Sequence, residues 1–351
     1  MNSIERIKAI LANQEVDRPA VSGWVHLPLV DRHVDDFVRA TISFTDYNRF
    51  DFIKVMTNGH YAAEAYGAEI KYSKDTTRWA GEFLRYPVRN AADAAALPVL
   101  DRDNPVFVRE KEIVRRLKEH YQGTLPIIGT LFTPLMWFQE IFSCAQQQPT
   151  IRFMREHGQE LEHALRAITD TSIHYLSQLV EGGVDGIFFA TQYARNIITN
   201  EEFNRFCRPY ELEILDYLRG KTWFDMLHVH GDANLDFNRI LDYPVHALNW
   251  ETSTASVPEE QLTSFRALRQ QTDKVFIGGI DQTTDFYVEE YDRAKLKGNL
   301  EKRLAQAIAE NGGNRFVFAP GCTLPMDVNH YAFTLIQEVA EESSRHRAPA
   351  R

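Results

Sequence analysis

Eight short apolar runs alternate with longer helical stretches along this chain, and this alternation constrains the fold more than any other feature. We expect strands at residues 19–26, 50–56, 125–131, 184–190, 223–230, 246–251, 274–281 and 315–321. The third, fourth, seventh and eighth runs are almost continuously apolar, as in strands covered on both faces. Strands that alternate with helices favour a parallel sheet. Eight of them predict a single α/β domain, a (β/α)8 TIM barrel, over residues 1–351.

The segment between the second and third predicted strands is too long for one helix. Within it, "GAEIKYSKDTTRWAGEFLRYPV" (67–88) alternates and turns in the manner of a β-hairpin, so we expect a hairpin-containing insertion at the barrel mouth. Helical patterns cover residues 101–123, 146–183 and 293–314, each ending at glycine or just before a strand. Residues 231–245, between the fifth and sixth strands, leave room for only a brief helix.

Charge and cysteine content narrow the class of protein. The net charge of −10 argues against nucleic acid or an anionic membrane surface as the main partner. The first residues lack a signal-peptide pattern, and no uncharged apolar run is long enough for a spanning helix. Cys144, Cys207 and Cys322 are odd in number and far apart, so we expect no disulfide framework and a cytoplasmic location.

Polar residues gather where the predicted strands end. In a barrel of this type the active site forms at the carboxyl ends of the strands, so these residues predict a small-molecule site. They are His26, Thr57, Asn58, Gly59, His60, Thr133, Gln192, His228, His230, Asn249, Trp250, Glu251, Asp281 and Cys322.

A metal site is the sharpest hypothesis among these residues. His228 and His230 are two apart, so both side chains leave the same face of a strand, and Cys322 follows a Pro-Gly turn at the eighth strand. Two imidazoles and a thiolate suit Zn²⁺ and leave a fourth position open, as in catalytic zinc sites. Glu251 is either a fourth ligand or a partner of a neighbouring helix. The alternative is two hydrogen-bonding histidines and an inert thiol.

Other residues at the strand ends are candidates for catalysis and binding. We predict catalytic roles for Asp281, which follows two glycines, and for His60. We predict substrate contacts for four further residues, namely His26, Asn58, Gln192 and Trp250. For each of them a purely structural role is the alternative. The chain has no P-loop and no dinucleotide-binding fingerprint.

Several stretches resemble the uroporphyrinogen decarboxylase superfamily, which also includes cobalamin-linked methyltransferases. The resemblance runs over nearly the whole chain and is most specific in "DRPAVSGWVH", "DFIKVM", "DGIFFATQ", "LHVHGD", "YPVHALNWE", "GGID" and "FAPGCTLP". It implies a (β/α)8 barrel independently of the strand pattern.

The methyltransferase branch resembles this chain more closely than the decarboxylases do. The decarboxylases carry an arginine-rich "RQAGR" segment and an "FSD" motif, where this chain reads "GWVHLPLVDR" and "FIKVMTNGH". The methyltransferases bind zinc through an H-x-C pair after the fifth strand and a cysteine in a "GC" turn at the eighth. His228 and Cys322 match that pattern, whereas His230 stands where the family usually has cysteine.

The resemblance implies methyl transfer to a zinc-activated thiol or similar acceptor. The donor would be a small methylated compound or a methyl-corrinoid carried by a partner protein, and relatives suggest a homodimer. Alternatives are a metal-independent carboxy-lyase acting on a carboxylated substrate, a zinc hydrolase of the amidohydrolase type, and a non-catalytic binding barrel. The amidohydrolases place their H-x-H at the first strand, which disfavours that class.

Overall fold

One parallel sheet contains all eight predicted strands. The computed structural model describes residues 1–144, 146–231, 233–254, 256–288 and 290–345. In the sheet the strands follow the order β1-β10-β9-β8-β7-β6-β5-β2, and every pair is parallel. The strands are β1 (Ala20–Val21), β2 (Ile53–Lys54), β5 (Ile127–Phe132), β6 (Gly186–Thr191), β7 (Met226–Val229), β8 (Ala247–Trp250), β9 (Val275–Ile280) and β10 (Phe316–Pro320).

The two edge strands, β1 and β2, are shorter than predicted but lie beside each other. The backbone N–H of Asp51 donates to the carbonyl of Val21 at 2.7 Å. The Ser22 hydroxyl donates to the carbonyl of Phe52 at 2.9 Å. Because these bonds join the first and last strands of the order, the sheet curls round on itself, consistent with the predicted barrel.

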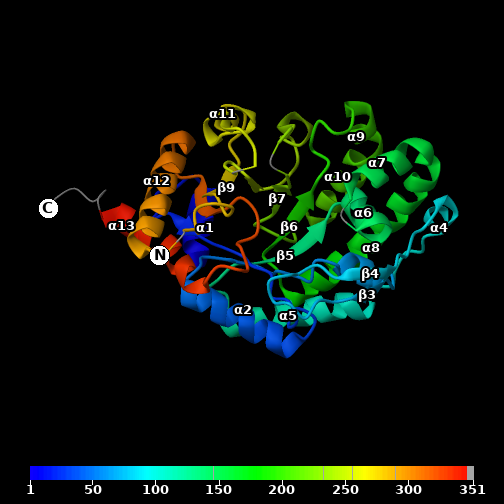
Figure 1. Ribbon diagram of the computed structural model, residues 1–351, viewed down its shortest axis with the longest axis horizontal. Helices are drawn as coiled ribbons and strands as arrows, with labels where there is room; N and C mark the ends of the chain where they lie inside the picture. Colours follow the sequence, from blue (N-terminus) through cyan, green and yellow to red (C-terminus); the bar gives the residue numbers. More distant parts are fainter. Residues whose placement is uncertain (145, 232, 255, 289, 346–351) are drawn as a thin grey trace.

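Helices surround the curled sheet, with α2 and α5 on one side and α12 and α13 on another (Figure 1). None of the helices in the described ranges is long and apolar enough to cross a membrane. The α-helices are α1 (Ser3–Leu11), α2 (Val34–Asn48), α3 (Tyr61–Ala65), α4 (Ala91–Ala95), α5 (Pro105–Tyr121), α6 (Pro134–Ser143), α7 (Gln147–Glu156), α8 (Gly158–Gly182), α9 (Asn200–Phe206), α10 (Arg208–Leu218), α11 (Phe265–Arg269), α12 (Arg293–Asn311) and α13 (Thr334–Arg345). The 3-10 turns are η1 (Phe237–Arg239), η2 (Glu259–Gln261) and η3 (His330–Phe333).

The helical pattern over 146–183 forms two helices, α7 and α8, instead of one. His157 lies between them with φ −135° and ψ 47°, outside the helical region. Gly158 then starts α8, which ends at Gly182 and is capped by Gly183 in the left-handed conformation with φ 92°. The amphipathic pattern continues across the break because both helices turn an apolar face to the core.

An antiparallel pair of strands lies between β2 and β5 in the chain. β3 (Glu69–Lys71) pairs with β4 (Glu82–Arg85), within the range where the sequence predicts a hairpin. The loop between them carries Trp79, whose indole stacks on the imidazole of His26 at 4.9 Å. The segment between β3 and β4 therefore contacts the segment that follows β1.

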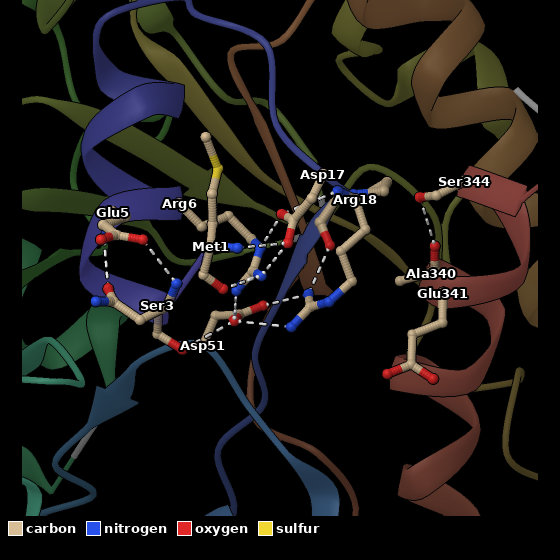
Figure 2. Close-up of polar contacts among 12 residues, drawn as sticks. Met1, Ser3, Glu5, Arg6, Asp17, Arg18, Asp51, Ala340, Glu341 and Ser344 are labelled. Carbon is tan, nitrogen blue, oxygen red and sulfur yellow. Dashed lines mark hydrogen bonds and ion pairs between the residues drawn. The ribbon is translucent and has the colours of Figure 1, made fainter. Parts of the chain in front are cut away.

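A buried ion-pair network holds the amino ends of β1 and β2 together (Figure 2). The Asp51 carboxylate, 1% exposed, accepts from the guanidinium groups of Arg6 and Arg18 at 2.7 Å each and from the backbone N–H of Val21 at 2.8 Å. Arg6 also pairs with Asp17 at 2.7 Å. The network lies at the opposite ends of the strands from the polar residues that predict the site.

Candidate metal centre

The three predicted metal ligands converge at the carboxyl ends of β7 and β10. One ligand atom from each of His228, His230 and Cys322 lies within 4.8 Å of the others. Nε2 of His228 is 3.3 Å from Nδ1 of His230. The Cys322 sulfur is 3.9 Å from the former nitrogen and 3.6 Å from the latter. β7 and β10 belong to the same curled sheet, and its curvature brings together residues that are 94 positions apart.

These separations fit a tetrahedral zinc ion. With metal–nitrogen and metal–sulfur bonds of the usual lengths, tetrahedral ligands are about 3.3 Å apart for N–N and about 3.6 Å apart for N–S. Only the sulfur–His228 distance is longer, by a few tenths of an ångström. The donor set of two nitrogens and one sulfur also suits Zn²⁺, and it leaves a fourth position for another ligand.

Asn249 fixes the tautomer of His228. Nδ1 of His228 lies 2.6 Å from the side-chain oxygen of Asn249, while the Asn249 amide group donates to the carbonyls of Ile277 and Pro320 at 2.8 and 3.1 Å. Since these bonds set the amide orientation, its oxygen accepts and Nδ1 of His228 carries the proton. Nε2 is left with a lone pair that faces His230 and Cys322, as a metal ligand requires.

The surroundings of His228 keep its imidazole neutral. His228 is 3% exposed, and its ring stacks on Phe188 of β6 with the ring centroids 4.8 Å apart. Burial lowers the pKa of His228 below its ordinary value, and the nearby thiol of Cys322 opposes that shift. A neutral imidazole is the form that binds a metal.

Gly321 allows the turn that presents Cys322. A Cβ at this position would lie 2.7 Å from Cα of Glu251 and 2.9 Å from the carbonyl oxygen of Trp250. Only glycine therefore lets the end of β10 approach the end of β8 so closely. Cys322 is the next residue, and the close approach at Gly321 directs its sulfur toward the histidines of β7.

An open cavity of about 690 Å³ leads to the metal group. The cavity is lined by His230, Gln192 and Glu251, so a predicted metal ligand and a predicted substrate contact face the same space. The Glu251 carboxylate accepts from Gln282 at 2.5 Å and does not belong to the three-residue group. Its role as a fourth ligand stays a prediction. The cavity is further lined by Gln146, Gln147, Gln148, Pro149, Arg195 and Gly231.

Two of the predicted substrate contacts, His26 and Asn58, lie near the hairpin. Nδ1 of His26 is buried without a hydrogen-bond partner, and burial lowers the pKa of this histidine to about 3. Asn58 is 1% exposed and bridges Asp31 and the backbone N–H of His60 at 2.9 Å each. His26 therefore has a free polar atom for a ligand, whereas both groups of the Asn58 amide are engaged.

The two predicted catalytic residues, His60 and Asp281, are held in hydrogen-bond networks. His60 is fully buried; its Nε2 accepts from the backbone of Gly81 at 3.0 Å. Asp281 accepts from the backbone and hydroxyl of Thr283 at 2.9 and 2.5 Å and from Ser253 at 3.3 Å. Neither belongs to the three-residue metal group. The contacts favour structural roles, and the catalytic roles stay predictions.

Trp250 lies on the other face of β8 from Asn249, because side chains alternate along a strand. It is fully buried, donates to the carbonyl of Thr263 at 2.7 Å and packs against Phe265 of α11. Its predicted contact with substrate is untested. Sequence reasoning placed Asn249 at the strand ends without an individual role. It did not single out Lys54, although a lysine within the apolar run "DFIKVM" is a signal of its own.

Comparison with known proteins assigns the chain to a family. The family model of uroporphyrinogen decarboxylase (URO-D) matches residues 18–342. The chain belongs to the uroporphyrinogen decarboxylase family. The resemblance noted from the sequence motifs is thereby confirmed.

The relatives of this chain include a decarboxylase and a methyltransferase. It is 24% identical over 194 residues to uroporphyrinogen decarboxylase of Aquifex aeolicus and 23% identical over 253 residues to methylcobamide:CoM methyltransferase MtbA of Methanosarcina acetivorans. The match to the Aquifex protein covers 54% of this chain and 54% of that protein. The match to the Methanosarcina protein covers 65% of this chain and 70% of that protein. The chain thus spans about half the length of the Aquifex relative.

Solved structures show the same fold. A methyltransferase from Methanosarcina mazei matches with a TM-score of 0.78 and 17% identity over 98% of this chain and 99% of that one. A B12-independent methionine synthase from Shewanella sp. W3-18-1 matches with a TM-score of 0.54 and 13% identity, over 94% of this chain and 98% of that one. At these identities the likeness concerns the fold alone.

Proposed function

We propose that this uroporphyrinogen decarboxylase family member is a zinc-dependent methyltransferase that methylates a thiol or similar acceptor. The observation that carries the proposal is the convergence of His228, His230 and Cys322 at separations close to those of tetrahedral zinc ligands. The methyltransferases among the relatives support it.

Several residues of this chain would have separate roles in such a site. A free thiol has a pKa of about 8.5, and zinc at this position would supply the positive charge that favours its thiolate. His228 offers the Nε2 lone pair that Asn249 keeps free. Gly321 positions the sulfur of Cys322. His230 lines the open cavity, through which an acceptor would reach the site.

The methyl donor is proposed to be a small methylated compound or a methyl-corrinoid brought by a partner protein. The relatives named for methylcobamide support the second source. In this proposal the curled sheet is a closed (β/α)8 barrel, and the β3–β4 pair is its insertion. The chain forms one cytoplasmic domain and assembles as a homodimer. An open cavity beside His230 suits a donor that approaches from outside the barrel.

A direct assay of methyl transfer tests the proposal. Zinc-loaded protein is mixed with methylcobalamin and a panel of small thiols, and demethylation of the cobalamin is followed by absorbance. We expect turnover that a chelator abolishes and added zinc restores, and that Cys322→Ser removes. Cys144→Ser, at a cysteine capping α6, serves as the matched control and should keep activity.

The carboxy-lyase alternative is favoured by the decarboxylase relative. It predicts release of carbon dioxide from a carboxylated substrate, unchanged by chelator and by Cys322→Ser. That result, together with no methyl transfer to any thiol, would contradict the proposal.

A further inference from the structure

Lys54 is a buried lysine without a carboxylate partner among the described residues. It ends β2, is 6% exposed, and its ammonium group donates to the sulfur of Met56 at 2.8 Å. A thioether is a weak acceptor. Among the described residues, no carboxylate lies within ion-pair distance of this lysine. A lysine in such a place normally has a partner, so the missing partner points to a ligand.

The position of Lys54 relates it to the metal group. Its ammonium group lies 4.5 Å from the centroid of the Phe188 ring, and the imidazole of His228 stacks on the same ring at 4.8 Å. One side chain therefore separates the lysine from a predicted zinc ligand. A molecule of only a few carbon atoms is long enough to place one end at the metal position and the other at Lys54.

A second buried polar group near Lys54 has no hydrogen-bond partner among the described residues. Nδ1 of His26 is buried without a hydrogen-bond partner, and its ring is held by stacking on Trp79. Burial, followed by the positive charge of Lys54, lowers the pKa of His26, which places the two side chains near each other. A neutral imidazole can donate one hydrogen bond beside the charged donor of Lys54.

The energetics of Lys54 point the same way. Burial lowers the pKa of this lysine to about 7, and the negative charge of Cys322 opposes that shift. An anion bound beside the ammonium group would favour its charged form, since opposite charges in a low-dielectric site interact strongly.

Charge balance gives a second argument. Zn²⁺ with two neutral histidines and one thiolate keeps a positive charge, to which Lys54 adds another. An acceptor that binds only as a thiolate neutralises one of these charges. An acceptor with an additional acidic group neutralises both.

We propose that Lys54, assisted by His26, is a specificity-determining residue that pairs with a carboxylate or sulfonate on the methyl acceptor. The inference rests on the proposed function, because the anion it binds belongs to the acceptor. It adds that a neutral thiol of the same size is a poorer ligand than an acidic one.

Calorimetric titration of zinc-loaded protein tests this preference without relying on turnover. The probes are 3-mercaptopropionate and its neutral amide, 3-mercaptopropanamide, and 3-mercaptopropane-1-sulfonate distinguishes the two kinds of acid. We expect the wild type to bind at least one acid about tenfold or more tightly than the amide. In Lys54→Met the preference should vanish while affinity for the amide and the zinc content stay unchanged. Lys302→Met, at an exposed position on α12, is the control.

Two results would overturn the inference, namely equal binding of acids and amide by the wild type, or a preference that survives in Lys54→Met. The first comparison needs no variant and so does not depend on the folding of Lys54→Met.

Metal-free protein separates this inference from the proposed function. Propionate, but not propionamide, should raise the thermal midpoint of the wild type and leave that of Lys54→Met unchanged. This result in a protein that binds no zinc would support the anion site and refute the zinc methyltransferase. Zinc binding without any effect of propionate, and without preference for acidic thiols, would refute the anion site alone.

Discussion

At the residue scale, the proposed zinc site depends on groups outside its three predicted ligands. Asn249 accepts from His228 and is itself held by two backbone carbonyls, so its oxygen cannot turn away. Partners of this kind orient metal-binding histidines and raise their affinity.

We therefore expect Asn249→Ala to weaken zinc binding by about 10–100-fold. Asn249→Asp keeps an acceptor for Nδ1 of His228 and should retain most of the affinity. Competition with a chromophoric chelator measures both. Equal zinc affinity in Asn249→Ala and the wild type would show that the hydrogen bond has no part in binding.

Lys54 gives a second prediction at this scale. Because burial lowers its folded-state pKa to about 7, protonation costs stability, and the loss develops as the pH falls from the ordinary lysine value toward 7. Lys54→Met removes that cost, so its free energy of unfolding at pH 7 should exceed the wild type by on the order of 3 kcal/mol. The gain should shrink toward pH 10. Urea denaturation at both pH values measures it, and a gain independent of pH would contradict the explanation.

At the element scale, the approach of the β8 and β10 ends sets the position of Cys322. Gly321→Ala places a Cβ against the backbone of Glu251, which cannot move without shifting β8. We expect a loss of about 1–3 kcal/mol in stability and weaker zinc binding, although every ligand is still present. Gly298→Ala, in α12 with nothing within 4 Å, should be neutral or slightly stabilising. Unchanged zinc affinity in Gly321→Ala would refute this role of the turn.

Strand positions were predictable at the element scale, but side-chain directions were predictable only in part. Apolar runs located all eight strands, and the spacing of His228 and His230 correctly placed both on one face. The same alternation puts Trp250 in the helix-facing core beside Phe265, which the residue type alone did not reveal. Lys54 was missed because a charge inside an apolar run matters only once its neighbours are known.

At the scale of the whole molecule, the buried ion pairs and the proposed zinc site lie at opposite ends of the sheet. The amino ends of β1 and β2 are joined by the Asp51 network, and the carboxyl ends of β7 and β10 carry the metal group. This separation lets the amino end secure the curled sheet independently of the site.

Asp51→Asn should therefore destabilise the fold by about 3–5 kcal/mol, because it leaves two buried guanidinium groups without their carboxylate. The zinc content of the folded protein should not change. Asp36→Asn, in an exposed pair with Arg39, is the control and should cost about 0–1 kcal/mol. Urea denaturation with metal analysis of the folded fraction measures both. Loss of zinc in folded Asp51→Asn would contradict the separation.

The central claim is the zinc centre, and its most direct test combines metal analysis with X-ray absorption at the zinc edge. The account predicts about one zinc per chain, bound by one sulfur and two imidazole nitrogens with a further light-atom ligand. The sulfur signal should disappear in Cys322→Ser, and His230→Ala should lose one imidazole. A protein that takes up no zinc after purification without chelator, or binds zinc without sulfur, would contradict the account.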